Sequence, residues 1–200
     1  MRTLLALSRL IDGLNDRIGK LAYWLVLGAV LVSSVNATVR KAFDTSSNAY
    51  LELQWYMFAA LFMLSGGYTL LKQEHVRIDV VYHRFSRRVQ IGIDIFGTVL
   101  FLLPMSLLML YLSWPFFYNS FQSGEVSANA GGLILWPVKL LIPVGFALLS
   151  LQGLSELVKR IAFLQGKVPD PGIREHSKPA ELELAEAIAA ERAAETGAAK

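Results

Sequence analysis

The sequence contains no cysteine, and this absence excludes several kinds of chemistry at once. Without thiols the chain cannot form a disulfide, bind a metal through thiolate ligands or use a cysteine nucleophile. It also has no Gly-rich phosphate loop, no HExxH zinc motif and no GxSxG nucleophile elbow. We therefore predict that the chain is not an enzyme and binds no cofactor.

Histidine is scarce, and the long apolar segments contain none. The three histidines are His75, His83 and His176. A haem held between membrane helices needs histidines at matching depth on facing helices, so a haem site is disfavoured. Asp79 and His83 are four residues apart and could together bind a metal, but a pair on a helix surface is the simpler interpretation.

Charge is low for a soluble domain. Charged residues make up 18% of the chain and hydrophobic residues 54%, and the mean hydropathy is +0.44. The net charge of +3 could indicate nucleic-acid binding. The basic residues, however, flank apolar segments, and this placement indicates contact with anionic membrane lipids instead.

Four apolar segments are each close to the ~20 residues that cross a hydrocarbon core of ~30 Å. They comprise residues 21–39, 53–71, 95–117 and 133–154. The first two carry no charged residue, whereas Lys139 interrupts the fourth. This pattern predicts an all-α membrane protein with four transmembrane helices, so we expect a membrane domain over residues 21–160.

Two further segments have the pattern of amphipathic helices that lie at a membrane surface. Residues 1–20 form the first, and its apolar face consists of Leu7, Leu10, Ile11, Leu14, Ile18 and Leu21. The second lies in the central loop, with Ile78, Val81, Tyr82, Phe85 and Val89 at helical spacing. Residues 161–200 form the last unit, an Ala/Glu-rich tail predicted to be cytoplasmic and partly helical.

The distribution of lysine and arginine predicts the orientation. Loops rich in these residues stay in the cytoplasm. The N-terminal segment, the central loop and the start of the tail are rich in them, whereas residues 119–132 have none. Three tryptophans, Trp55, Trp114 and Trp136, fall at the predicted outer ends of segments, as interfacial aromatic residues do. Both termini and the central loop are therefore expected in the cytoplasm.

A few polar residues near the segments are candidates for a role. Glu52, Asp94 and Glu156 stand close to predicted interfaces, where structural pairing or solvation is the simpler interpretation and ion handling the alternative. Lys139 lies between two prolines. It could pair with a carboxylate such as Glu125, reach lipid headgroups or contact a partner subunit, and the sequence leaves these options open.

Three stretches carry a resemblance to a known family. They are ELQWYMFAALFMLSGGYTLLKQEHVRIDVVYHRFSRR (52–88), SGEVSANAGG (123–132) and WPVKLLIPVGFALLSLQGLSELVKR (136–160). Together they resemble the small, DctQ-type membrane subunit of TRAP (tripartite ATP-independent periplasmic) transporters. Within that family the likeness is greatest to the subgroup named for mannitol or chloroaromatic compounds. The tail after Pro169 lies outside the family pattern.

The resemblance implies a function as one part of a transporter in the bacterial inner membrane. In this family the small subunit is a scaffold for a large, DctM-type membrane subunit that carries the substrate and Na⁺ sites. A periplasmic binding protein delivers an organic acid or related solute. Candidate structural or partner-contact residues are Glu52, His75, Arg77, Asp79, Lys139 and Glu156, with membrane lipids as further partners. Two alternatives remain: a stand-alone four-span exporter and a four-helix redox or quinone module.

Overall fold

A computed structural model describes residues 1–44, 47–73 and 85–168 of the chain. These residues form helices and no strand. The long helices are α1 (Arg2–Phe43), α2 (Asn48–Lys72), α5 (Leu103–Ser123) and α6 (Trp136–Leu164). A shorter helix, α4 (Arg87–Gly97), leads into α5 through the π-helical segment η1 (Thr98–Leu102).

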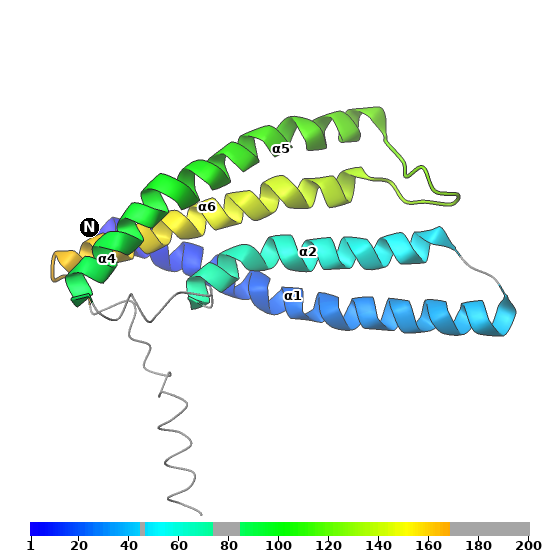
Figure 1. The fold of residues 1–200 in the computed structure, drawn as a ribbon, viewed down its shortest axis with the longest axis horizontal. Helices are drawn as coiled ribbons and strands as arrows, with labels where there is room; N and C mark the ends of the chain where they lie inside the picture. Colours follow the sequence, from blue (N-terminus) through cyan, green and yellow to red (C-terminus); the bar gives the residue numbers. More distant parts are fainter. Residues whose placement is uncertain (45–46, 74–84, 169–200) are drawn as a thin grey trace, which may run out of the picture.

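The long helices lie roughly along one direction (Figure 1). α6 is central, because α1, α2 and α5 all pack against it, while α1 and α2 also pack against each other. One end of the molecule carries the N-terminus, α4 and the end of α6. The opposite end carries the last turn of α1, the first turn of α2 and the connection between α5 and α6 (Figure 1).

Three helical stretches are long and apolar enough to cross a membrane: Arg2–Phe43, Arg87–Ser123 and Trp136–Leu164. They contain three of the predicted segments wholly or in large part. The remaining segment, 53–71, lies within α2, which has 25 residues. α2 is long enough to cross a membrane but is not among the described helices that meet both the length and the hydropathy expected of a span. The described part of the chain is therefore all-helical with three candidate spans, and the fourth span stays a prediction.

α1 is one continuous helix of 42 residues, about 63 Å long at 1.5 Å per residue. The chain does not leave the helical conformation at Lys20, so the predicted surface segment 1–20 and the predicted span 21–39 share one helix. A placement of residues 1–20 at the membrane surface remains a prediction. The central-loop amphipathic helix lies for the most part outside the described residues.

The first half of α1 packs through its small and polar residues. Leu10 and Leu21 are 67% and 68% exposed, although both belong to the apolar face expected from the sequence. The buried positions in this half are Ser8, Ile11, Asn15, Gly19 and Ala22, so Ile11 is the one large apolar side chain among them. Between membrane helices, small residues let the backbones approach closely, while large apolar side chains gain nothing by leaving lipid.

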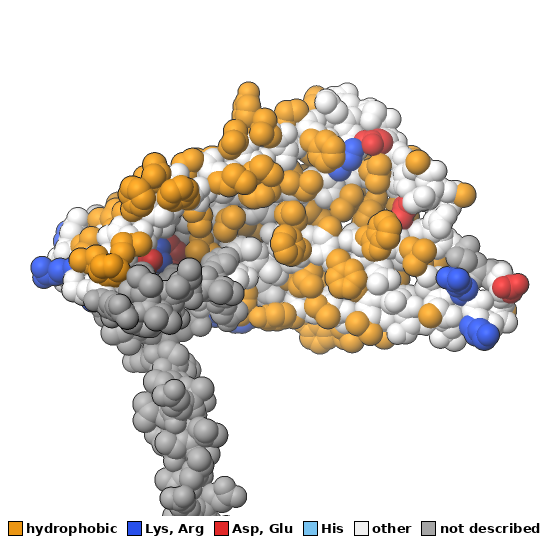
Figure 2. All heavy atoms as spheres, in the orientation of Figure 1, with side chains coloured by type: hydrophobic (Ala, Val, Ile, Leu, Met, Phe, Trp, Pro, Cys, Tyr) orange, Lys and Arg blue, Asp and Glu red, His pale blue; other side chains and the backbone are white. Residues whose placement is uncertain are grey.

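The same rule holds elsewhere in the bundle. A Cβ added at Gly145 of α6 would lie 2.7 Å from the carbonyl oxygen of Met63 in α2, so this helix contact requires glycine. Midway along the bundle Ser150 Oγ donates a 2.9 Å hydrogen bond to Ser106 Oγ, which joins α6 to α5. Figure 2 shows the complementary surface: hydrophobic side chains cover the middle of the visible face, and charged side chains gather toward its ends.

The π-helical segment has a local cause. Pro104 has no backbone N–H and its ring would collide with the carbonyl four residues earlier in a regular α-helix. Widening the helix over Thr98–Leu102 relieves this conflict, and the Leu103 N–H donates to the Thr98 carbonyl five residues back. α4, η1 and α5 consequently continue as one 37-residue helix, Arg87–Ser123.

Candidate functional site

The candidate residues from the sequence do not come together at one place. Glu52 and Lys139 lie at the end of the molecule that carries the α5–α6 connection, and Glu156 lies on the last part of α6 at the other end. His75, Arg77 and Asp79 lie outside the described residues. Each described candidate has its own set of contacts.

Glu52 fixes the connection between α5 and α6. This carboxylate is only 5% exposed, although it lies in the second turn of α2. Its Oε2 accepts a 2.7 Å hydrogen bond from the Leu133 N–H, and its Oε1 accepts one of 2.8 Å from Asn129 Nδ2. The Ser127 hydroxyl also donates to Oε1. One carboxylate therefore satisfies three donors of a loop that has few helical hydrogen bonds of its own.

Two neighbours on the same face of α2 complete this attachment. Asn48 Nδ2 donates to the Ala130 carbonyl at 3.1 Å, and the Tyr56 hydroxyl donates to the Ile134 carbonyl at 3.1 Å. Residues four apart lie above one another on a helix, so Asn48, Glu52 and Tyr56 form one row. We call this row, with the loop residues that it contacts, the loop clamp.

The loop held by the clamp has internal order. Val126 and Ile134 pair as an isolated antiparallel bridge, and the Ser127 N–H donates to the Leu133 carbonyl at 2.9 Å. At the base of the loop the Leu135 N–H donates to the Glu125 carbonyl at 2.9 Å. Gly124, at φ 60°, ends α5 in the left-handed conformation that glycine adopts without strain.

The hydrogen bonds of the clamp stabilise the charged form of Glu52. The Leu133 N–H contributes most, followed by Ser127 and Asn129, and together they lower the pKa of the Glu52 carboxyl below its usual 4.5. A carboxylate held in this way is an anchor for a loop, because all its described partners are donors that favour ionisation.

Lys139 pairs within the chain. Its ammonium forms an ion pair with Glu125, and Nζ lies 4.3 Å from the centre of the Phe116 ring. The Lys139 side chain is 14% exposed and that of Glu125 is 42% exposed. The pair joins the first turn of α6 to the loop after α5, and the lysine lowers the pKa of the Glu125 carboxyl. Of the options that the sequence left open, pairing with Glu125 is the one present in the structure.

Glu156 belongs to a polar cluster between α1 and α6, which we call the α1–α6 cluster. Its members are Ser8, Asp12, Asn15, Gln152, Ser155, Glu156 and Lys159. Gln152 is fully buried at its centre: it accepts from Asn15 Nδ2 at 2.9 Å and donates to Asp12 Oδ1 at 2.9 Å. Ser155 Oγ donates to the same Asp12 oxygen at 2.7 Å.

The carboxylates of this cluster face two basic residues of α6. Lys159 Nζ lies 3.1 Å from Asp12 Oδ2 and also forms an ion pair with Glu156, which is 2% exposed. Arg160, on the next position of α6, lies 4.0 Å from the other Glu156 oxygen and 3.4 Å from Asp94 on α4. Ion pairs of this kind tie α1, α6 and α4 together at one end of the bundle.

Sequence reasoning missed the partners of Glu156. Asp12, Asn15 and Gln152 are not among the candidate residues that the sequence pattern indicated. One signal existed: Ser8, Asp12 and Asn15 recur at spacings of four and three, as do Gln152, Ser155 and Lys159. Polar residues at helical spacing beside an apolar segment predict a polar seam between helices.

The contacts of these sites are made within the chain itself. Among residues 1–44, 47–73 and 85–168, no three His, Asp or Glu side chains are grouped so that they could hold a metal ion. The buried carboxylates Glu52 and Glu156 instead bond to serine, asparagine, glutamine and lysine side chains of this chain and to its backbone.

Comparison with known families identifies the family of this chain. Residues 21–163 match the family model described as "Tripartite ATP-independent periplasmic transporters, DctQ component". The chain belongs to this family. It is thus a small membrane subunit of a TRAP transporter and a multi-pass protein of the inner membrane, in a family of transporter subunits and not of enzymes.

The region that matches the DctQ family contains the sites at the α5–α6 connection completely and the α1–α6 cluster only in part. It includes the whole loop clamp and the Lys139–Glu125 pair, but only the α6 half of the α1–α6 cluster. Asp12 and Asn15 precede it, in the part of α1 that lies before the matched residues. Among curated proteins, none matches the chain closely enough to name a relative.

Proposed function

We propose that this DctQ subunit is a static scaffold for a large, DctM-type membrane subunit. Together the two would take up an organic acid or related solute, coupled to Na⁺ and delivered by a periplasmic binding protein. The observation that carries the proposal is the position of the charged groups. In the described helices the charged side chains that form ion pairs with one another lie toward the two ends of the bundle.

A transport site has different requirements. Secondary transporters bind substrate and coupling ions near the membrane midplane, between interrupted helices with unsatisfied polar groups. Here the midway contact between α5 and α6 is the Ser106–Ser150 hydrogen bond, and both hydroxyls have partners. This supports a subunit that positions others and leaves substrate binding to its partner.

The proposed topology follows the charge pattern. The four spans 21–39, 53–71, 95–117 and 133–154 cross the membrane, and both termini and the central loop face the cytoplasm. Residues 1–20 and the central loop contact the inner surface, and residues 161–200 form a cytoplasmic tail. The loop clamp then faces the periplasm, on the side from which a binding protein approaches.

The candidate residues divide into those that hold the subunit together and those proposed to contact other molecules. Glu52, Lys139 and Glu156 hold the shape of the subunit, as their internal bonds indicate. His75, Arg77 and Asp79 are proposed as contacts to the large subunit or to lipid headgroups. Within the family, the mannitol or chloroaromatic subgroup is proposed from the resemblance of the three sequence stretches alone.

The decisive experiment is reconstitution. The tagged chain is expressed with and without the large subunit encoded by the same organism, and purified in a mild detergent. We expect the large subunit to copurify and only the pair, with the binding protein, to give Na⁺-dependent uptake in liposomes. Uptake by this chain alone would contradict the scaffold and support an exporter, and visible absorbance of the purified chain would support a redox module.

A further inference from the structure

The first half of α1 has a basic face that no described part of the chain covers. Ser8, Asn15 and Gly19 are buried against the bundle, and exposed residues at spacings of four, three, four, four and three lie on the opposite side of the helix. They comprise four basic residues and two small ones between them: Arg2, Ala6, Arg9, Gly13, Arg17 and Lys20. We call these six residues the basic face. In the proposed topology the exposed leucines beside it face lipid, which leaves the basic face toward the cytoplasm.

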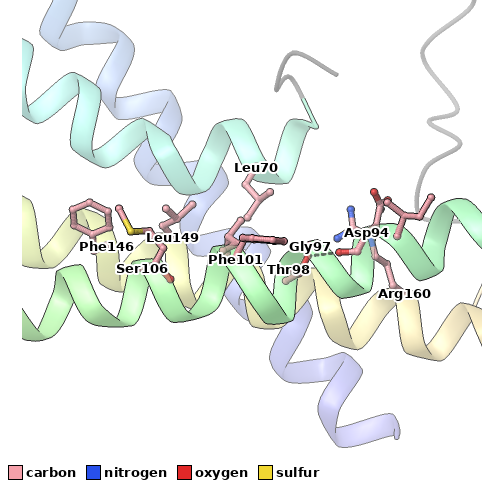
Figure 3. A pocket seen from close by; sticks show the side chains of 12 residues that line it. Leu70, Asp94, Gly97, Thr98, Phe101, Ser106, Phe146, Leu149 and Arg160 are labelled. Atoms are coloured by element: carbon pink, nitrogen blue, oxygen red, sulfur yellow. Dashed lines mark hydrogen bonds and ion pairs between the residues drawn. The ribbon is translucent and has the colours of Figure 1, made fainter. Parts of the chain in front are cut away.

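The arginines of the basic face have no acidic partner in the described part of the chain. Among residues 1–44, 47–73 and 85–168, Arg2, Arg9 and Arg17 form no ion pair. The aspartates at this end of the bundle already have basic partners: Asp94 with Arg160 (Figure 3), Asp12 with Lys159, and Asp16 with Lys20 and Lys72. An acidic partner for these arginines must therefore come from outside the described residues.

One segment of the chain has the opposite charge. Residues 180–196 contain one basic residue, Arg192, and five acidic ones: Glu181, Glu183, Glu186, Glu191 and Glu195. Their formal charge is −4. Residues 74–84 and residues 169–179 each contain two acidic and two basic residues and are formally neutral. Charge complementarity therefore favours residues 180–196 as the segment that meets the basic face.

The chain leaves the described region close to the basic face. The last part of α6 runs beside the first half of α1, where Ser155 Oγ lies 2.6 Å from Ser8 Oγ, and the described residues end at Val168. Residues 169–179 span up to about 36–40 Å when extended. Residues 2–20 of α1 cover about 27 Å, and residues 180–196 would cover about 25 Å as a helix. The acidic segment can therefore reach the basic face and has a similar length.

We propose that residues 180–196 dock along the basic face of α1, held by ion pairs between their glutamates and the four basic residues. A Cβ at Gly13 would meet nothing within 4 Å, so a second backbone can approach α1 between these residues. The segment is tethered to the same molecule, so its effective concentration is on the order of millimolar and weak exposed ion pairs suffice to hold it. An anionic membrane surface repels the glutamates, which leaves the basic face as their favourable contact.

Crosslinking tests the contact, because the chain has no cysteine of its own. One cysteine replaces Ala6 on the basic face or, as the matched control, its exposed neighbour Leu7 on the leucine side. A second replaces Ala187, Ala189 or Ala190, which sample different sides of the segment. Both sets of pairs have nearly the same tether length, so only docking distinguishes them.

The full chain is treated with a bifunctional maleimide in neutral detergent at low salt. After correction for the reactivity of each single cysteine, we expect the best Ala6→Cys pair to crosslink within one chain about tenfold faster than the best Leu7→Cys pair. Equal rates would overturn the docking. So would crosslinks that join two copies, or loss of the crosslink in vesicles rich in phosphatidylglycerol, because these results assign the basic face to a second copy or to lipid.

Charge exchange gives a second test in the same crosslinking assay. Arg9→Glu with Arg17→Glu should slow the Ala6→Cys crosslink about tenfold, and so should 1 M salt, where the Debye length falls to about 3 Å. Adding Glu183→Lys and Glu186→Lys to the arginine variant should restore most of the rate, since the two partners have then exchanged sign. An unchanged rate in the arginine variant, or a slow rate that the lysines do not restore, would contradict the ion-paired arrangement.

Discussion

The Glu52 carboxylate accepts a 2.7 Å hydrogen bond from the backbone N–H of Leu133, 81 residues further along the chain. Glu52 stands just before the predicted span 53–71, and Leu133 stands at the end of the loop between α5 and α6. This bond and its two side-chain neighbours fix the α5–α6 loop on α2. One carboxylate therefore provides three of the hydrogen bonds that hold the loop.

Replacing that carboxylate should loosen the loop. In Glu52→Gln the new amide group brings donors to a place where Leu133, Asn129 and Ser127 already donate, so at least one bond is lost. We expect a lower Tm and faster proteolysis within residues 124–135. Tyr56→Phe, which removes one bond of the loop clamp, should have a smaller effect, and Tyr50→Phe should have none. Equal proteolysis of all three variants would contradict the loop clamp.

Acid should weaken the same region. The folded protein lowers the pKa of Glu52 and of Glu125 below the usual 4.5. Groups with a depressed pKa contribute stability that is present above 4.5 and is lost as the pH falls through the folded value. We expect the Tm to fall below about pH 4.5 in wild type and to fall less steeply in Glu52→Gln. A Tm profile that is identical in the two proteins would exclude this linkage.

The Lys139–Glu125 pair should show coupling with only a modest effect on assembly. Lys139→Met leaves the Glu125 carboxylate 42% exposed and hence in contact with water, so no buried charge is stranded. Recovery of the large subunit should therefore match wild type. A double-mutant cycle with Glu125→Gln measures the pair: the double variant should lose less Tm than the sum of the single variants. Additive losses would mean that the pair contributes nothing.

Two adjacent glycines on α2 should respond in opposite ways to alanine. A Cβ at Gly67 would overlap Asn15 Oδ1 and lie 3.3 Å from the Leu148 carbonyl, whereas a Cβ at Gly66 would meet nothing within 4 Å. Gly67→Ala should cost about 1–3 kcal/mol through overpacking at the junction of α1, α2 and α6. Gly66→Ala should be neutral or stabilise by about 0.5–1 kcal/mol. Thermal unfolding in one detergent compares them, and a stable Gly67→Ala protein would contradict the close approach of α1.

Labelling tests the proposed topology, since the chain has no cysteine of its own. Single cysteines replace Ser86, which precedes α4, and Ser123, the last residue of α5. With the central loop in the cytoplasm, an impermeant thiol reagent added to intact cells should label Ser123→Cys and not Ser86→Cys. Permeabilised cells provide the control, in which both should react. The reverse pattern in intact cells would invert the topology.

The sequence by itself determined the class of this protein and the approximate course of its helices. Apolar segments long enough to span a bilayer must satisfy their backbone hydrogen bonds locally, so their length and composition predict helices with no knowledge of their neighbours. The position of Pro137 in the first turn of α6 and the charged residues at the ends of the bundle also follow from the sequence pattern alone. The three stretches that resemble DctQ proteins all lie within the matched region, residues 21–163.

Only the tertiary structure decided which faces of these helices meet. In water, apolar periodicity identifies the buried face, but in a membrane lipid accepts apolar side chains as readily as protein does. Leu10 and Leu21 are exposed, while Ser8 and Asn15 are buried. The contacts of Asp12 with Gln152 and of Glu52 with Leu133 join segments 140 and 81 residues apart. A hydrogen bond between such segments exists only once α6 has packed against α1 and α2, so no local pattern in either segment specifies it.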